Sequence, residues 1–190
     1  MYKVTFIIGS THSNGSSAYL VDTMIKGINN SSAAVKKYYI GAIKMNYCFG
    51  CKKCYVSGEC IQDDEVKNVV LDILSSDLVV IVAPSWWAGV PAQLKALIDR
   101  TTPYGDTNPN RKYKAEKNIK GIAIAVRAGV REQENELILN AITHYFGHLG
   151  IETVERISIC QTDTLSDLLE KHQTEIAKVF ELGKRIGELK

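Results

Sequence analysis

The sequence lacks a strong net charge and a long apolar run. Its 190 residues include 23 lysines and arginines against 21 aspartates and glutamates, so the formal net charge is only +2. A charge this small gives no reason to expect nucleic acid or an anionic membrane as a partner. No apolar stretch could span a bilayer, and the N-terminal run shows no signal-peptide cleavage pattern. We therefore expect a cytoplasmic protein without nucleic-acid or membrane partners.

Internal repeats and low-complexity tracts are also missing, which excludes repeat architectures. The composition is otherwise ordinary, with 45% hydrophobic and 23% charged residues. A chain of this length can bury a substantial core. We expect residues 1–190 to form a single domain.

Cysteine is scarce outside one short segment. Four of the five cysteines follow the spacing C-x2-C-x2-C-x5-C, at Cys48, Cys51, Cys54 and Cys60. In a reducing compartment such a run favours metal ligands or redox thiols over structural disulfides. Four close thiolates can hold a [4Fe–4S] cluster, whereas structural zinc usually takes two C-x2-C pairs set further apart. The loop could also fold without metal, its thiols packing as small hydrophobes, so all three alternatives stay open.

Apolar, β-branched runs alternate with amphipathic helical patterns along the chain. Strands are expected at 3–8, 35–40, 78–83, 119–126 and 153–159. Helices are expected at 16–28, 64–74, 92–99, 132–149 and 164–189. Five such units predict an α/β three-layer sandwich, with a parallel sheet covered by helices on both faces. The strand order 2-1-3-4-5 is common in doubly wound sheets, which bind ligands beyond the carboxyl ends of their strands.

The loop after the first strand, residues 9–17, combines glycines and hydroxyls just before a helix. Backbone amides and the helix dipole favour an anion such as phosphate there. The loop has no G-x-G-x-x-G pattern and no Walker lysine, so dinucleotide and P-loop sites are disfavoured. An ordinary helix cap by Ser16 or Ser17 is compatible with phosphate binding.

The loop after the third strand holds two adjacent tryptophans, Trp86 and Trp87, followed by Gly89 and Pro91. Aromatic rings beside backbone amides form a platform for a flat heterocycle. The same rings could instead cap the core or a subunit interface. The chain offers no general acid–base pair and no Ser-His-Asp arrangement, so we name no catalytic residue and expect a cofactor to carry the chemistry.

These motifs resemble the flavodoxin-like NAD(P)H-dependent FMN reductases. The resemblance covers nearly the whole chain and is carried by Gly9-Ser10, Gly15-Ser16-Ser17, Ala83-Pro84, Trp87, Pro91 to Lys95 and Asp99-Arg100. The cysteine spacing is similar to that of the iron–sulfur flavoprotein branch. The resemblance implies an FMN-dependent oxidoreductase that passes electrons from NAD(P)H or a reduced protein to a flavin, quinone or other acceptor.

The resemblance also implies the cofactor-binding residues. They are Ser10, His12, Asn14, Ser16 and Ser17 in the first loop, Pro84, Ser85, Trp86, Trp87 and Gly89 in the second, and Ala128 and Gly129 in a third. His12 stands where an arginine is frequent and supplies less reliable charge near neutral pH. Relatives are commonly homodimers or homotetramers, with the flavin near an interface.

Two further expectations follow from the chain order. The cysteine run comes after the second strand, so topology predicts that it lies near the phosphate loop and the flavin. The polar connection at 102–117 is interpreted as solvated surface, although its lysines could meet a nicotinamide phosphate. Arg127 and Arg131 are also interpreted as solvated surface, although they could instead tune the N1/O2 edge of the flavin, where reduction places negative charge.

Two other functions remain open. One is a non-enzymatic flavodoxin-type electron carrier, although such carriers are usually acidic and this chain is not. The other is a redox sensor that uses the cysteines as thiols or metal ligands without needing flavin.

Overall fold

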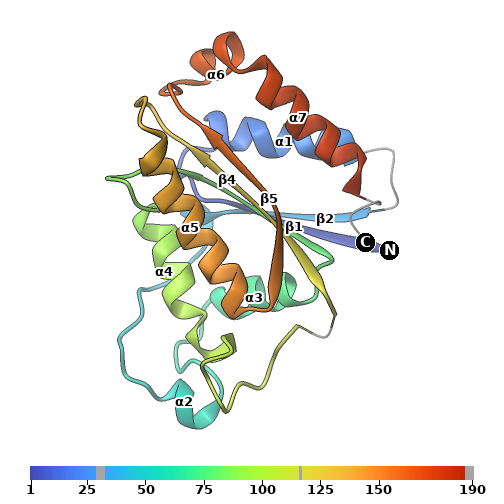
Figure 1. The fold of residues 1–190 in the computed structure, drawn as a ribbon. Helices are drawn as coiled ribbons and strands as arrows, with labels where there is room; N and C mark the ends of the chain where they lie inside the picture. The colour runs from blue at the N-terminus through green and yellow to red at the C-terminus, as the bar shows by residue number, and fades with distance from the viewer. Residues whose placement is uncertain (29–32, 116, 187–190) are drawn as a thin grey trace.

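The computed structural model describes residues 1–28, 33–115 and 117–186, which contain a five-stranded parallel sheet (Figure 1). The strands are β1 (Tyr2–Ile8), β2 (Ala33–Tyr39), β3 (Leu78–Pro84), β4 (Ile119–Val126) and β5 (Ile151–Ile159). Their spatial order is β2-β1-β3-β4-β5, and every neighbouring pair is parallel. The predicted fold class and strand order are confirmed.

Helices cover both faces of this sheet (Figure 1). One face carries α1 (Ser16–Ile28), α6 (Leu165–Lys171) and α7 (Gln173–Lys184). The other carries α3 (Val66–Leu74), α4 (Ala92–Arg100) and α5 (Glu132–His148). Three short elements lie in the connections: the single-turn helix α2 (Cys54–Ser57) and the 3-10 helices η1 (Ile40–Ala42) and η2 (Thr102–Tyr104).

Side chains alternate between two apolar cores along the strands, as the two-residue period of a strand requires. Val4, Phe6 and Ile8 of β1 pack under α1, whereas Ile7 packs on the opposite face. The central strand β3 is buried on both faces, which explains its uninterrupted apolar sequence. Within the described residues, no helix has both the length and the apolar character needed to cross a membrane.

The C-terminal region differs from the prediction. A single helix was expected at 164–189, but α6 ends at Lys171 and α7 begins at Gln173. Between them His172 adopts φ −125° and ψ 40°, outside the helical region. The break lets α7 lie against α1, so closely that a Cβ on Gly183 would come within 2.2 Å of the Met24 carbonyl oxygen. Residues 187–189 of the predicted helix lie outside the described residues.

Candidate functional site

The loops after β1, β3 and β4 meet at the carboxyl edge of the sheet around a cavity of about 400 Å³. This volume is typical of small-molecule sites. The predicted cofactor residues that line the cavity are Ser10, His12, Ser16, Ser17, Pro84, Ser85, Trp86 and Ala128. Three loops that are far apart in the sequence therefore supply one site, because parallel strands end at the same edge.

The first loop presents donors to the cavity. The Gly9 amide donates to the Val82 carbonyl at 2.8 Å, which carries the chain one residue beyond β1. A Cβ on Gly9 would lie 2.9 Å from Leu94, so only glycine lets the loop pack this tightly. Beyond the loop, α1 begins at Ser16 with no acidic residue in its first turn. Its first amides have no carbonyl partner inside the helix and, with the hydroxyls, suit a bound anion.

The second loop is a two-residue turn. Trp86 and Gly89 exchange backbone hydrogen bonds of 2.9 Å in both directions. Between them Trp87 and Ala88 have φ values of +52° and +56°, a region that costs a residue with a Cβ about 1–2 kcal/mol. The turn leaves Trp86 59% exposed and Trp87 fully exposed. Both rings are therefore available to a ligand or another chain.

In the third loop, Arg127 is not the solvated surface residue that was predicted. Arg131 is exposed as predicted, but the Arg127 side chain is only 12% exposed and lines the cavity. Its guanidinium donates to the Arg131 carbonyl and pairs with Glu134, each at 2.7 Å. Its buried Nε has no hydrogen-bond partner among the described residues. Arg127 is thus a fixed cation at the site and not a solvated surface residue.

The remaining predicted cofactor residues lie at the margin. Asn14 lines an adjoining hollow of about 520 Å³ together with Asp163, Thr164 and Leu165. Trp87, Gly89 and Gly129 belong to the loops but are absent from the cavity lining. Sequence reasoning missed Thr11, Val126, Thr162 and Asp163. Thr162 and Asp163 follow β5, so reading the carboxyl end of that strand as well would have found them.

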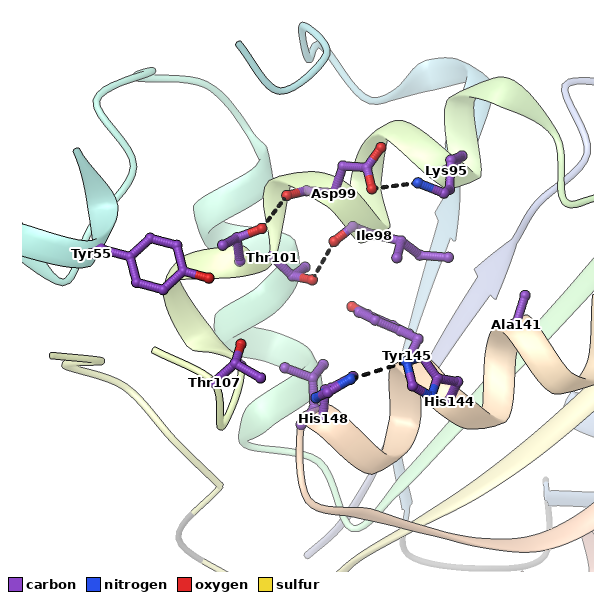
Figure 2. Close-up of a pocket in the computed structure, with 13 residues that line it drawn as sticks. Tyr55, Lys95, Ile98, Asp99, Thr101, Thr107, Ala141, His144, Tyr145 and His148 are labelled. Atoms are coloured by element: carbon purple, nitrogen blue, oxygen red, sulfur yellow. Dashed lines mark hydrogen bonds and ion pairs between the residues drawn. The ribbon is translucent and has the colours of Figure 1, made fainter. Parts of the chain in front are cut away.

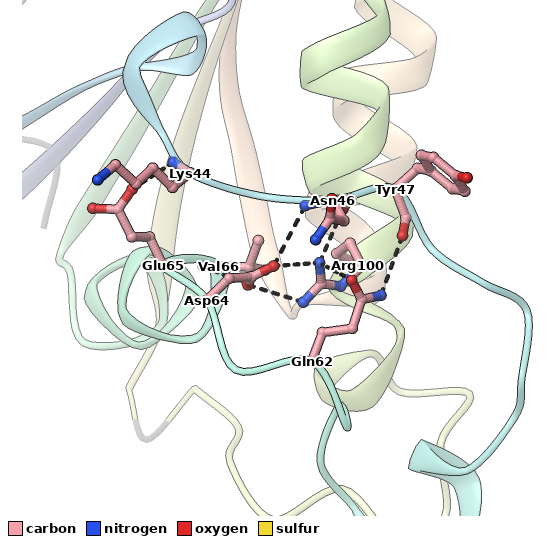
Figure 3. A network of polar contacts seen from close by, with 8 residues as sticks. All are labelled: Lys44, Asn46, Tyr47, Gln62, Asp64, Glu65, Val66 and Arg100. Carbon is pink, nitrogen blue, oxygen red and sulfur yellow. Dashed lines mark hydrogen bonds and ion pairs between the residues drawn. The ribbon is translucent and has the colours of Figure 1, made fainter.

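A buried arginine closes the base of the cysteine loop (Figure 3). The Arg100 side chain is 1% exposed, and its two Nη atoms donate to the two Asp64 carboxylate oxygens at 2.7 and 2.9 Å. Nη1 also donates to the Asn46 carbonyl at 2.9 Å and to Gln62 Oε1 at 3.1 Å. Asn46 precedes the four cysteines and Gln62 follows them. One guanidinium therefore joins both ends of the loop to the last residue of α4.

Asp64 lies two residues before α3, where a carboxylate can cap a helix. It does accept from the Val66 amide, at 3.2 Å, but its main partner is Arg100. Burial acts to raise the pKa of the Asp64 carboxyl, whereas hydrogen bonds from Arg100 and from the Val66 amide outweigh burial and hold the pKa below its usual value. The carboxyl is therefore ionised at neutral pH, as a buried guanidinium requires.

The segment after η2 braces the tip of the cysteine loop. Asn108 is buried and donates to the Cys54 carbonyl at 3.1 Å, and Asn110 donates to the Tyr55 carbonyl at 2.6 Å. Lys112 pairs with Glu59 at 2.9 Å. This connection was predicted to be a solvated face, and many of its residues, Lys112 among them, are exposed, but Asn108 and Asn110 contact residues some fifty positions earlier.

The four clustered thiols are all free and share one neighbourhood. Cys48 and Cys51 are exposed, and Cys54 and Cys60 are partly buried. Burial raises the pKa of the Cys54 thiol, and the nearby thiols of Cys60, Cys48 and Cys51 raise it further. Within the described ranges, no three or more His, Cys, Asp or Glu side chains converge closely enough to hold a metal ion. The donor types suit iron or zinc, but the loop would have to close around the group.

The position of this loop corrects the prediction that it lies near the carboxyl edge. Its base is fixed at Arg100, whereas the turn at Trp86 precedes the other end of α4. Nine helical residues at about 1.5 Å each separate the two ends by about 13 Å. In Figure 1, α2 lies at the far end of the molecule from the loops after β3 and β4. The connection after β2 runs down the side of the sheet because its contacts are with α4 and η2.

Comparison with known proteins gives an independent view of the chain. Residues 2–160 match the NADPH-dependent FMN reductase family. An iron–sulfur flavoprotein of Archaeoglobus fulgidus is 36% identical over 132 residues, which cover 70% of this chain and 57% of that protein. An iron–sulfur flavoprotein of Methanocaldococcus jannaschii is 30% identical over 145 residues, which cover 76% of this chain and 70% of that protein. The chain thus spans little more than half the length of the first of these relatives.

A structural neighbour supports the fold. The NAD(P)H:quinone oxidoreductase from Methanothermobacter marburgensis superposes with a TM-score of 0.76, covering 98% of this chain and 97% of that one, at 13% identity. The family and the branch expected from the motifs are both confirmed by these comparisons.

Replacing Arg100 with methionine is expected to lower the free energy of unfolding by about 3–5 kcal/mol, because Asp64 would keep its charge without a partner. Chemical denaturation at neutral pH measures this loss. The control is Lys95→Met, which removes an exposed ion pair on the same helix and should cost at most about 1 kcal/mol. Equal losses in the two variants would contradict the role given to Arg100.

The effect of Arg100→Met should also depend on pH. The pKa of Asp64 is lower in the folded chain than its unfolded value of about 3.9. The stabilisation from the pair is therefore fully present above that value and is lost as the pH falls through the folded-state pKa. We expect the stability difference between wild type and variant to narrow below about pH 4. A difference that stays constant through this range would argue against the ion pair.

Proposed function

The chain belongs to the NADPH-dependent FMN reductase family, and on that premise we propose that it is an oxidoreductase that binds FMN at the carboxyl edge of its sheet. It would pass electrons from NAD(P)H or a reduced protein to a flavin, quinone or other acceptor. The cavity formed by the loops after β1, β3 and β4 is the observation that carries this proposal. We further propose that residues 1–190 act as one FMN-binding domain in the cytoplasm.

The first loop is proposed to hold the phosphate. The start of α1 supplies amides and a positive dipole end, and Ser10 and Ser17 supply hydroxyl donors, whereas the Ser16 hydroxyl donates to the Thr164 carbonyl at 3.2 Å and would have to turn to reach a phosphate. His12 lines the same cavity and can donate one further hydrogen bond. Asp163 adds a carboxylate to the lining of this cavity and also lines the adjoining hollow at Asn14, and its negative charge would repel a phosphate there. A phosphate is therefore best accommodated on the side of Ser10 and Ser17.

The second and third loops are proposed to hold the isoalloxazine ring. Pro84, Ser85 and Trp86 line the cavity from the second loop, and Arg127 and Ala128 line it from the third. FMN supplies the redox chemistry when bound, because its ring accepts a hydride and releases electrons singly or in pairs. The chain orients the ring and excludes water from one face. Arg127, fixed by Glu134, places positive charge where a reduced ring gains negative charge.

We propose that Cys48, Cys51, Cys54 and Cys60 hold a [4Fe–4S] cluster. The support is the thiol donor set, the electrostatic proximity of the three other thiols to Cys54, and the relatives described as iron–sulfur flavoproteins. Gly50 and Gly58, at φ +63° and +73°, and Lys52, at +56°, supply the tight turns needed for closure. Arg100 keeps the two ends of the loop together while its tip closes.

A homodimer or homotetramer is proposed as the working form. The fully exposed Trp87 at the tip of its turn supports an interface, because a large exposed aromatic side chain is typical of association surfaces.

Removing phosphate-loop hydroxyls should weaken FMN without affecting riboflavin. We expect Ser10→Ala and Ser17→Ala to raise the dissociation constant for FMN about 2- to 10-fold each, as for a single lost hydrogen bond. Flavin fluorescence titration measures both ligands, and Ser75→Ala, at the far end of α3, is the control variant. An equal loss of riboflavin affinity would argue against phosphate contacts by these hydroxyls.

Steady oxidation of NADH or NADPH separates an enzyme from an electron carrier. We expect the FMN-loaded protein to oxidise a nicotinamide cofactor over many turnovers with a quinone as acceptor. The expected kcat is about 1–10³ per second, which is typical of enzymes. The control is the same protein without flavin. Stoichiometric reduction without turnover would favour the carrier, and a chain that takes up no FMN would favour the thiol sensor.

Anaerobically purified protein should contain about four iron and four sulfide per chain if the cluster is correctly assigned. Serine at any one of Cys48, Cys51, Cys54 or Cys60 should lower this content and change the visible spectrum. Cys160→Ser should leave both unchanged, because Cys160 lies after β5 beside Asn135, far from the loop. Zinc at one per chain would replace the cluster proposal, and a metal-free loop would leave thiol chemistry.

A further inference from the structure

Two histidines on α5, which line neither the cavity at the carboxyl edge nor the cysteine loop, face each other (Figure 2). His144 and His148 are four residues apart, so one turn of helix places them on the same face. Their Nε2 atoms are 3.1 Å apart, with the two rings perpendicular. His144 is exposed and the His148 side chain is 40% exposed, so solvent reaches both nitrogens. They border a cavity of about 380 Å³ that Tyr55 also lines.

A carboxylate fixes the orientation of one ring. Asp106 Oδ1 lies 2.6 Å from Nδ1 of His148, and the Asp106 amide donates to the His148 carbonyl at 2.9 Å. In the neutral ring Nδ1 carries the proton donated to Asp106, which leaves the Nε2 lone pair of His148 free to accept. His144 would supply the proton that now lies between the two Nε2 atoms. A carboxylate behind a histidine in this way is the usual outer partner of a metal-bound imidazole.

We propose that His144 and His148 form a two-histidine binding site for a borderline divalent transition metal such as Zn²⁺, Cu²⁺ or Ni²⁺. Imidazole nitrogens suit these ions, and metal–nitrogen distances are about 2.0–2.1 Å. Two nitrogens 3.1 Å apart then subtend an angle of about 98° at the metal. That angle lies between the right angle of square-planar or octahedral sites and the wider tetrahedral angle, so the separation of the two nitrogens suits a metal once the rings turn both lone pairs toward it.

The metal replaces the hydrogen bond between the two Nε2 atoms. His144 moves its proton from Nε2 to Nδ1, both Nε2 lone pairs then point at the ion, and no net charge leaves the two neutral rings. Water fills the other coordination positions, because within the described residues no third His, Cys, Asp or Glu converges with the pair. Affinity should therefore be lower than at a site with three or four protein ligands.

The site also lies on the segment that braces the cysteine loop. Asp106 holds His148, and two residues later Asn108 holds the Cys54 carbonyl. A bound metal would fix the imidazole that Asp106 contacts and so stabilise this connection. The site is nevertheless separate from the four thiols and does not depend on what they hold.

Histidine ring resonances test the proposal one site at a time, even while the thiols also bind metal. We would titrate the isotopically labelled full chain with Zn²⁺ and follow the ring nitrogens of all four histidines. We expect the Nε2 signals of His144 and His148 to shift together, and those of His12 and His172 to stay in place. No shift, or similar shifts at all four rings, would overturn the proposal.

Three variants sharpen this test. His144→Ala should abolish the response of His148, and Asp106→Asn should weaken Zn²⁺ binding about 10- to 100-fold, as loss of an outer partner does. Thr143→Ala is the matched control and should bind as wild type does, because Thr143 of α5 lines a neighbouring hollow together with Asp106 and both histidines. If His148 responds fully without His144, the two rings do not form one site.

Discussion

The buried ion pair between Arg100 and Asp64 is the constraint on which the arrangement of the cysteine loop depends. A guanidinium cannot lose its charge, so burial obliges it to find acceptors for its N–H groups. Those acceptors come from Asn46, Gln62 and Asp64, on both sides of the four cysteines. The pair costs desolvation on both sides, and its clearest consequence is a fixed position for the loop rather than added stability.

Helix α4 connects the two candidate sites, the cavity at the carboxyl edge and the cysteine loop. It begins just after the strained turn at Trp86 and Gly89, and its last residue is Arg100. The central strand β3, buried on both faces, sets the position of the turn. The cavity at the carboxyl edge and the cysteine loop are therefore held at opposite ends of one rigid element, and within one chain they do not touch.

A second set of hydrogen bonds connects the cysteine loop to α5. Asp106 joins the segment after η2 to His148, and Asn108 joins it to Cys54. Long connections in compact domains are often functional, and here the polar side chains of the connection serve as braces. The histidine pair, the connection and the thiols thus form a continuous set of contacts outside the sheet. That continuity explains why a polar segment without regular structure follows a defined path.

The sequence by itself determined the layers, because the hydrophobic period is local, whereas the strand order and the loops expected at the cavity came from the common topology of doubly wound sheets. It also pointed to most of the residues that line the cavity, such as Ser10, Ser17 and Trp86. Only the tertiary structure decided where the cysteine loop lies, which partner Asp64 takes and which carboxylate meets His148. The contact between Arg100 and Asp64 joins residues 36 positions apart, and that between His148 and Asp106 joins residues 42 positions apart. No local sequence pattern indicates contacts over such separations. The break at His172 has the same origin, since packing of α7 on α1 overrides a continuous helical pattern.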